Sequence, residues 1–180
     1  MIETNKHTKK SILWGLSWLS DKLNSISIIL VVALMLSMTI IVLAQVFSRY
    51  ILKNSITWSE EIARWLMIWI CFLGSGIAVK YSQHIGLSFI VDRLNKKVQN
   101  IFSLLTNTGI LIFLYFCILK SFTLTQFVIN QKTAAAQISM AWPYSSVPIG
   151  CMIMLVHIIV IIFENLKNIF GKNFSKEEIN

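Results

Sequence analysis

The sequence alternates long apolar runs with short polar segments, and the runs have the length of membrane-crossing helices. Residues 26–47, 98–119 and 142–163 are stretches of 22 residues without Asp, Glu, Lys or Arg. At about 1.5 Å of rise per residue, such a stretch covers a hydrocarbon core of roughly 30 Å. Each of the three stretches therefore predicts a transmembrane helix.

A fourth apolar run is shorter and has a charge at its entrance. Residues 65–79 are uncharged over only 15 residues. This run crosses the membrane only if residues 62–64 are added and the Arg64 guanidinium reaches back to the headgroups. We therefore predict an all-α integral membrane protein in which residues 1–180 form one domain of four transmembrane helices, at residues 26–47, 62–79, 98–119 and 142–163.

Two of the connecting segments have a helical pattern of their own. Residues 11–23 combine polar Asp21 and Lys22 with two tryptophans and with an apolar stripe made of Ile12, Leu16, Leu19 and Leu23. This amphipathic pattern predicts an interfacial helix that lies along the membrane surface. Residues 83–96 also place apolar residues at helical spacing and predict a second amphipathic interfacial helix, although an ordinary turn around Gly86 is equally compatible.

Composition and charge agree with a membrane location. The 180-residue chain is 56% hydrophobic and 13% charged, and its mean hydropathy is +0.69. This is more apolar surface than a small soluble core buries. The net charge of +8 comes from bases scattered beside the apolar runs. They are placed to face phospholipid headgroups, which argues against nucleic acid as a partner.

The distribution of basic residues predicts the topology. Eleven of the 16 Lys and Arg residues flank the spans on the side of the chain termini, and five lie on the other side. The positive-inside rule then places both termini in the cytoplasm. A cleaved signal peptide is the competing interpretation of the first span. However, the apolar stretch and the 25-residue segment before it are both longer than the corresponding regions of a usual signal peptide.

The segment WSEEIARW, residues 58–65, places three charges against the start of the second span. Thr57 and Glu60 form a capping pattern, which predicts that the helix begins at Trp58. Glu60 also precedes Arg64 by four residues, the favourable order for an ion pair. The cluster is compatible with an interfacial anchor and with a site that docks another protein. Its candidate residues are Arg49, Tyr50, Trp58, Glu60, Glu61, Arg64 and Trp65.

The spans themselves offer packing residues and no catalytic motif. Gly74 and Ala78 have the small-x-x-x-small spacing that permits close helix contact, although glycine is also common in membrane helices. No Asp or Glu lies inside a span, and no P-loop, GxSxG or HExxH motif is present. His157 stands alone in its span, whereas a haem held between two helices needs a second ligand. We therefore expect neither enzymatic activity nor a cofactor.

Three motifs, FSRY, WSEEIARWLMIWICFLGSGIAVK and HIGLSFIVDRL, follow one another between residues 47 and 94. In this order the chain resembles the small, Q-type membrane subunit of the tripartite ATP-independent periplasmic (TRAP) transporters. The resemblance covers roughly residues 26–165. It is carried by Arg49, Tyr50, Trp58, Glu60, Glu61, Arg64, Trp69, Gly74, His84 and Asp92.

The resemblance implies a role in a bacterial inner-membrane transport system. Such systems take up organic acids, for example sialic acid or C4-dicarboxylates, by sodium-coupled symport and receive them from a periplasmic binding protein. A large membrane subunit moves the substrate by an elevator motion, and the small subunit is expected to be its static scaffold. Two alternatives remain open: a stand-alone small transporter, and the membrane anchor subunit of a respiratory complex.

Overall fold

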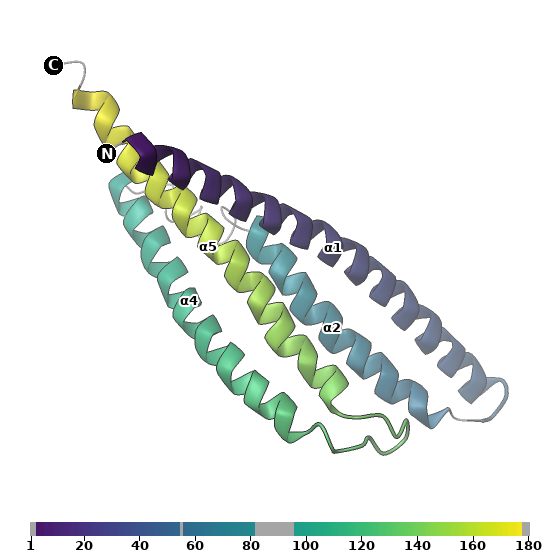
Figure 1. Cartoon of the computed structure of the whole chain (residues 1–180). Coiled ribbons are helices and arrows are strands. Elements are labelled where there is room, and N and C mark those ends of the chain that lie inside the picture. The colour runs from purple at the N-terminus through teal and green to yellow at the C-terminus, as the bar shows by residue number, and fades with distance from the viewer. Residues whose placement is uncertain (1–2, 55, 82–95, 178–180) are drawn as a thin grey trace.

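The computed structural model describes residues 3–54, 56–81 and 96–177, and most of them are helical (Figure 1). The helices are α1 (Glu3–Tyr50), α2 (Thr57–Tyr81), α4 (Lys96–Phe127) and α5 (Ala141–Glu177). All four contain a segment long and apolar enough to cross a membrane. Within the described residues, the strand pairing is limited to an isolated bridge between Lys132 and Ser139. The predicted all-α fold with four transmembrane helices is confirmed.

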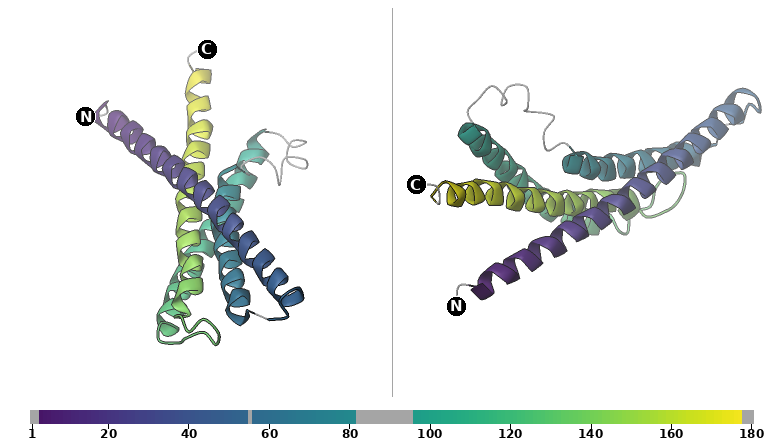
Figure 2. Two further views of the ribbon diagram at one scale, coloured as in Figure 1. Left: turned by 90° about the vertical axis from the view of Figure 1, so that its right-hand side faces the viewer. Right: turned by 90° about the horizontal axis from the view of Figure 1, so that it is seen from above.

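The helices are arranged around α2 and α5. α5 packs against α4 on one side and against α2 on the other, while α1 lies along α2 and touches α5. In the turned views α1 crosses α5 obliquely, so that the N-terminal end of α1 and the C-terminal end of α5 diverge (Figure 2). We call this end of the bundle the terminal end. The opposite end, which holds residues 51–54, 56 and 128–140, is the loop end (Figure 1).

Helix α1 differs from the sequence-based prediction. The sequence predicts a separate interfacial helix at residues 11–23, but this segment and the first span form one continuous helix of 48 residues. The physical reason is that no Gly or Pro occurs between residues 16 and 50 to end the helix. At about 1.5 Å per residue, α1 is about 72 Å long, more than twice the thickness of the hydrocarbon core. The second predicted interfacial helix, at residues 83–96, lies almost entirely outside the described residues.

Two glycines allow α2 and α5 to approach closely. A Cβ added at Gly150 of α5 would lie 2.6 Å from the Cβ of Phe72, and one added at Gly76 of α2 would lie 3.1 Å from Ile153 Cγ2. The predicted small-residue pair lies elsewhere on α2. A Cβ at Gly74 would meet no atom of another element within 4 Å, and Ala78 is exposed. Within this chain the close helix contact is therefore at Gly76, and packing through Gly74 and Ala78 stays a prediction.

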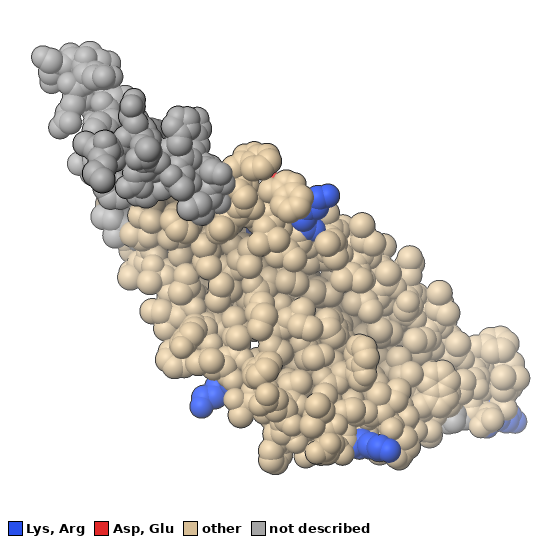
Figure 3. Space-filling view, viewed as in Figure 1, with Lys and Arg blue, Asp and Glu red and all other residues tan. Residues whose placement is uncertain are grey.

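The outer faces of α1 and α4 are apolar, as expected of surfaces that lie in lipid. Exposed side chains include Ile29, Leu36, Ile40 and Leu43 of α1, and Leu105, Phe113 and Phe116 of α4. In the space-filling view the Lys and Arg side chains lie towards the edges of the visible face, and its middle is free of charged residues (Figure 3). The buried apolar core is small and lies between α4 and α5, where it consists of Leu114, Cys151, Ile158 and Ile161.

Candidate assembly site

The predicted charged cluster lies at the loop end, where α1 and α2 run side by side. Gln45 and Arg49 are one helical turn apart on α1, and both reach Glu60 of α2. Gln45 Nε2 donates a hydrogen bond of 3.0 Å to Glu60 Oε1. Arg49 Nη1 lies 3.9 Å from the same oxygen, and both charged side chains are more than half exposed. We call Gln45, Arg49, Glu60, Glu61 and Arg64 the loop-end cluster.

The ion pair expected within α2 is not the one that the structure contains. The sequence pairs Glu60 with Arg64, but the Glu60 carboxylate is turned towards α1. Arg64 is exposed and forms no ion pair with any described residue. The reason is tertiary: α1 packs along α2 and brings an amide and a guanidinium to Glu60. Arg64 is thereby left as an exposed cation at the start of a transmembrane helix.

Glu61 binds a loop that is distant in sequence. The connection between α4 and α5 folds back on itself through backbone hydrogen bonds from Thr133 N to Ile138 O, 2.9 Å, and from Met140 N to Gln131 O, 2.8 Å. At its tip, the backbone N–H groups of Ala135 and Ala136 donate to the Glu61 carboxylate, the shortest of these bonds being 2.8 Å. Hydrogen bonds to an ionised carboxylate are stronger than those between neutral groups. Glu61 therefore attaches this loop to the start of α2.

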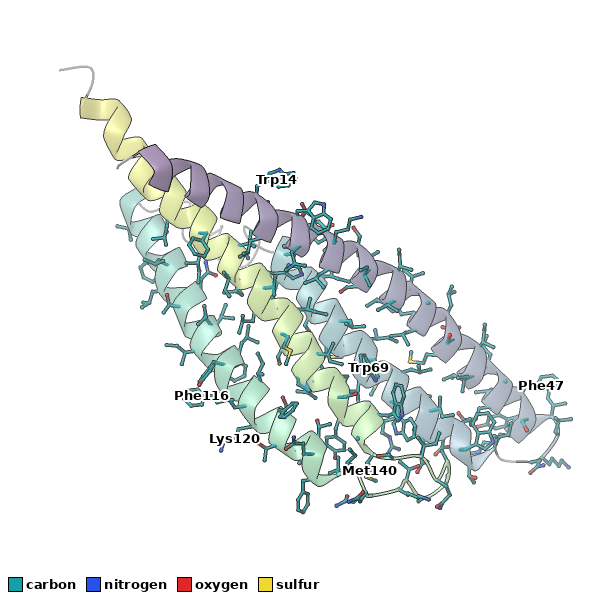
Figure 4. All side chains as sticks on the ribbon, viewed as in Figure 1. Trp14, Phe47, Trp69, Phe116, Lys120 and Met140 are labelled. Atoms are coloured by element: carbon teal, nitrogen blue, oxygen red, sulfur yellow. The ribbon has the colours of Figure 1, made fainter. Side chains whose placement is uncertain are left out.

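The aromatic residues at the loop end are of two kinds: one forms a contact between helices, and others are exposed. Trp69, which is labelled in Figure 4, donates a hydrogen bond of 3.2 Å from Nε1 to the backbone oxygen of Trp142 and so joins α2 to the start of α5. Tyr50 and Trp58 are instead exposed, by 74% and 47%, and Trp65 is half-buried. Exposed Tyr and Trp at the end of a membrane helix are typical of the headgroup level. The cluster thus contains both tertiary contacts and candidate interfacial anchors.

A second polar cluster, which the sequence did not predict, lies near the terminal end and joins three helices. Ser20 Oγ and His157 Nδ1 are 2.7 Å apart and link α1 to α5. Asn24 Nδ2 donates to Tyr81 Oη at 3.0 Å, and Lys80 Nζ lies 2.6 Å from Asp21 Oδ1; both contacts link α1 to α2. We call Ser20, Asp21, Asn24, Lys80, Tyr81 and His157 the terminal-end cluster.

The sequence contains one signal that could have revealed this cluster. Ser20, Asn24 and Ser27 recur every three or four residues and therefore share one face of α1. All three are buried, with exposures of 3%, 4% and 2%. His157 is also buried, at 1% exposure, although its sequence context shows no partner. The remaining predicted site residues, His84 and Asp92, lie outside the described residues.

In the described parts of the chain, no three His, Cys, Asp or Glu side chains are grouped closely enough to hold a metal ion. The contacts of both clusters instead join helices to one another or to a loop. Four apolar helices with lipid-like outer faces and polar contacts at both ends define a helical multi-pass membrane protein.

Comparison with known proteins identifies the family. Residues 38–168 match the family model described as "Tripartite ATP-independent periplasmic transporters, DctQ component". The chain belongs to this family, and the predicted resemblance is confirmed. It is a small permease component of a TRAP transporter and a multi-pass bacterial membrane protein.

Three TRAP transporter permease proteins are similar to this chain in sequence. The sialic acid TRAP transporter small permease protein SiaQ of Vibrio cholerae is 28% identical over 160 residues, which cover 89% of this chain and 92% of the relative. A putative TRAP transporter small permease protein of Haemophilus influenzae is 33% identical, over 68% of this chain and 70% of the relative. The sialic acid TRAP transporter permease protein SiaT of Haemophilus influenzae is 26% identical over 74% of this chain, but the match covers only 21% of that longer protein.

Proposed function

We propose that this chain is the static scaffold of a sodium-coupled TRAP transporter for organic acids, such as sialic acid or C4-dicarboxylates. In this function it binds a large membrane subunit that moves the substrate, and a periplasmic binding protein delivers the substrate to the complex. The observation that carries the proposal is that side-chain contacts join α1, α2 and α5 at both ends of the bundle.

These contacts restrict motion within the bundle. At the loop end, Glu60 binds α1, Glu61 binds the loop between α4 and α5, and Trp69 binds the start of α5. At the terminal end, the contacts of Asp21 and Asn24 with α2 and of Ser20 with α5 repeat the arrangement. Sliding or tilting α1 against α2 would break contacts at both ends. Ser20 and Asn24 are buried, and leaving a buried polar group unpaired costs about 1–3 kcal/mol, so the bundle favours one arrangement.

The lack of carboxylates in the middle of the spans supports a passive role. The central segments of the four spans lack carboxylates, and ion or proton pathways through membranes generally use intramembrane ionisable residues. We therefore place substrate and sodium binding on the large subunit. On the same grounds we propose that the chain is not an enzyme and has no cofactor of its own.

The relatives and the loop-end cluster support the proposed partners. The match to one fifth of SiaT is compatible with a small part that works beside a much larger permease part. We propose that exposed Arg64 and its neighbours at the loop end contact the large subunit. The positive-inside rule places the loop end in the periplasm and both termini in the cytoplasm of a bacterium with this inner-membrane system. The loop attached to Glu61 is then available to the binding protein.

The terminal end has features that suit contact with phospholipid. Trp14 and Trp18 are exposed by 74% and 54%, and Lys22 Nζ lies 5.8 Å from the centroid of the Trp18 ring. Amphipathic aromatic rings and lysines at the headgroup level anchor membrane proteins at a fixed depth. A scaffold needs such anchoring, because a neighbouring domain that moves across the membrane would otherwise drag it along.

Transport by purified components tests the function. The chain, a large TRAP membrane subunit and a binding protein are reconstituted separately and together in proteoliposomes under an inward sodium gradient, and uptake of labelled sialic acid and C4-dicarboxylates is measured. We expect uptake only when all three components and the gradient are present. Uptake by this chain alone would identify a stand-alone transporter, and haem absorbance with a copurifying redox partner would identify a respiratory anchor subunit.

A cross-linking experiment tests the static role separately. In a variant without the native cysteines, Asp21→Cys and Lys80→Cys are joined by a short bis-maleimide, which locks α1 to α2 at the terminal end. We expect the cross-linked complex to retain the uptake rate of the same variant before cross-linking. Loss of uptake on cross-linking, with the complex still assembled, would show that the small subunit has to move.

A further inference from the structure

Two buried polar atoms of the terminal-end cluster have no hydrogen-bond partner among the described residues. They are Asn24 Oδ1 on α1 and His157 Nε2 on α5. The residues are only 4% and 1% exposed. The other polar atoms of the same side chains are engaged: Asn24 Nδ2 binds Tyr81 Oη and His157 Nδ1 contacts Ser20 Oγ. Each side chain is therefore held in place with one polar atom directed into the bundle.

Leaving both atoms unpaired would be costly. A buried donor or acceptor without a partner costs about 1–3 kcal/mol. Native proteins usually avoid this cost with an internal water, which binds where two to four polar groups converge. Ser20 and Asn24 are four residues apart on one face of α1, a spacing that separates Cβ atoms by about 5–6 Å. His157 contacts Ser20, so it packs on the same face of α1 on which Asn24 lies one turn further along.

The hydroxyl groups of α1 indicate which histidine nitrogen carries the proton. Ser25, Ser37 and Thr39 donate to carbonyl oxygens of their own helix. The Ser20 hydroxyl is buried and instead lies 2.7 Å from His157 Nδ1. Because the Ser20 hydroxyl does not donate to a carbonyl oxygen of α1, we take His157 Nδ1 as the acceptor of its hydrogen. The hydrogen of the neutral imidazole then resides on Nε2, which becomes the donor that needs an acceptor.

We propose that a single water molecule binds between His157 Nε2 and Asn24 Oδ1 and completes one network across α1, α2 and α5. The water accepts from Nε2–H and donates to Oδ1. The full order of donation runs from Ser20 to His157, to the water, to Asn24 and to Tyr81, whose exposed ring reaches the edge of the bundle. In this order each of these atoms has a partner, and every group stays neutral. The site does not depend on the proposed transport function.

A chain in which the terminal-end cluster is unaltered tests the site directly. The full chain is labelled with ¹⁵N-histidine and placed in lipid nanodiscs, with His7→Gln and His84→Gln removing the other two histidine signals. We expect a neutral ring with the proton on Nε2, an unprotonated Nδ1, and magnetisation transfer from a bound water to the Nε2 proton. A proton on Nδ1 would overturn the proposal. A contact of the Nε2 proton with the Asn24 amide and none with water would overturn it as well.

A pair of variants assigns the water to Asn24. Asn24→Leu removes the oxygen that would accept from the water, and we expect loss of the water contact at His157 Nε2. Ser27→Ala is the matched control, because Ser27 is also buried on α1 but takes no part in these contacts. We expect its water signal to be retained. Retention of the signal in Asn24→Leu would overturn the assignment. If that variant does not fold, the spectrum of the chain with the unaltered cluster still decides whether the water is bound.

Discussion

Replacement of Gly150 by alanine tests how closely α2 and α5 pack. The added Cβ would lie 2.6 Å from Phe72 Cβ and 3.0 Å from the Phe72 backbone oxygen. Carbon atoms in favourable contact are about 3.5–4.0 Å apart. The backbone of α2 therefore has to move away, because no side-chain rotation removes a clash with a Cβ and a main-chain oxygen. We expect Gly150→Ala to destabilise the bundle.

Two opposing effects determine the size of the loss. Overpacking of a tightly packed interior costs about 1–3 kcal/mol, while alanine in place of glycine within a helix gains up to about 1 kcal/mol. We expect the free energy of unfolding to fall by about 1–2 kcal/mol, which changes the unfolding equilibrium roughly 5- to 30-fold.

Two other glycines serve as graded controls. An alanine Cβ at Gly76 would lie 3.1 Å from Ile153 Cγ2, a longer contact than the 2.6 Å at Gly150 and one to a side-chain methyl with no main-chain atom involved, so a smaller loss is expected. At Gly109 of α4 nothing lies within 4 Å, and Gly109→Ala should leave stability unchanged or slightly increased. Unfolding in mixed micelles with increasing dodecyl sulfate, followed by circular dichroism, measures all three variants. Equal stability of Gly150→Ala and Gly109→Ala would refute the reasoning.

Three further predictions concern polar contacts. Glu61→Gln should increase hydrogen exchange at the two tip amides of the α4–α5 loop while the helices stay protected, since the neutral amide has one acceptor oxygen in place of two and lacks the charge that strengthens these hydrogen bonds; unchanged exchange would contradict the role of Glu61. Arg64→Ala should lower recovery of the large subunit in a pull-down from detergent, whereas Lys53→Ala should not; normal recovery at normal expression would leave Arg64 only an anchoring role. Ser20→Ala should lower the free energy of unfolding by about 1–3 kcal/mol because it leaves His157 Nδ1 unpaired, and Ser37→Ala, which removes an exposed hydroxyl, should have little effect; similar losses in both would show that the buried contact is not special.

The spans could be predicted because their signals are local. The length and hydropathy of residues 26–47 or 142–163 decide by themselves whether a helix crosses the membrane. The motifs at Arg49 and in residues 58–65 are equally local, and they were sufficient to indicate the family. The start of α2 was predicted to within one residue, at Trp58 against Thr57.

The structure of α1 shows where local signals are insufficient. Asp21, Lys22 and Asn24 indicate a polar segment outside the membrane, and that segment is indeed helical. Whether the helix stops before the first span depends on what surrounds it. Here Asp21 and Asn24 are held by α2, and Ser20 by α5, so the polar residues are stabilised without a break in the helix.

The sequence by itself determined the number of spans, the membrane class, the family and the position of the charged segment. Only the tertiary structure decided which residues meet: Glu60 with Arg49 instead of Arg64, Gly76 and Gly150 at the close contact of α2 and α5, and His157 with Ser20. The physical reason is that helical spacing specifies which side chains share a face, whereas the neighbour of that face depends on how the helices pack. In lipid the neighbour of a helix face is especially hard to predict, because an apolar surface can face either the membrane or another helix at similar free energy.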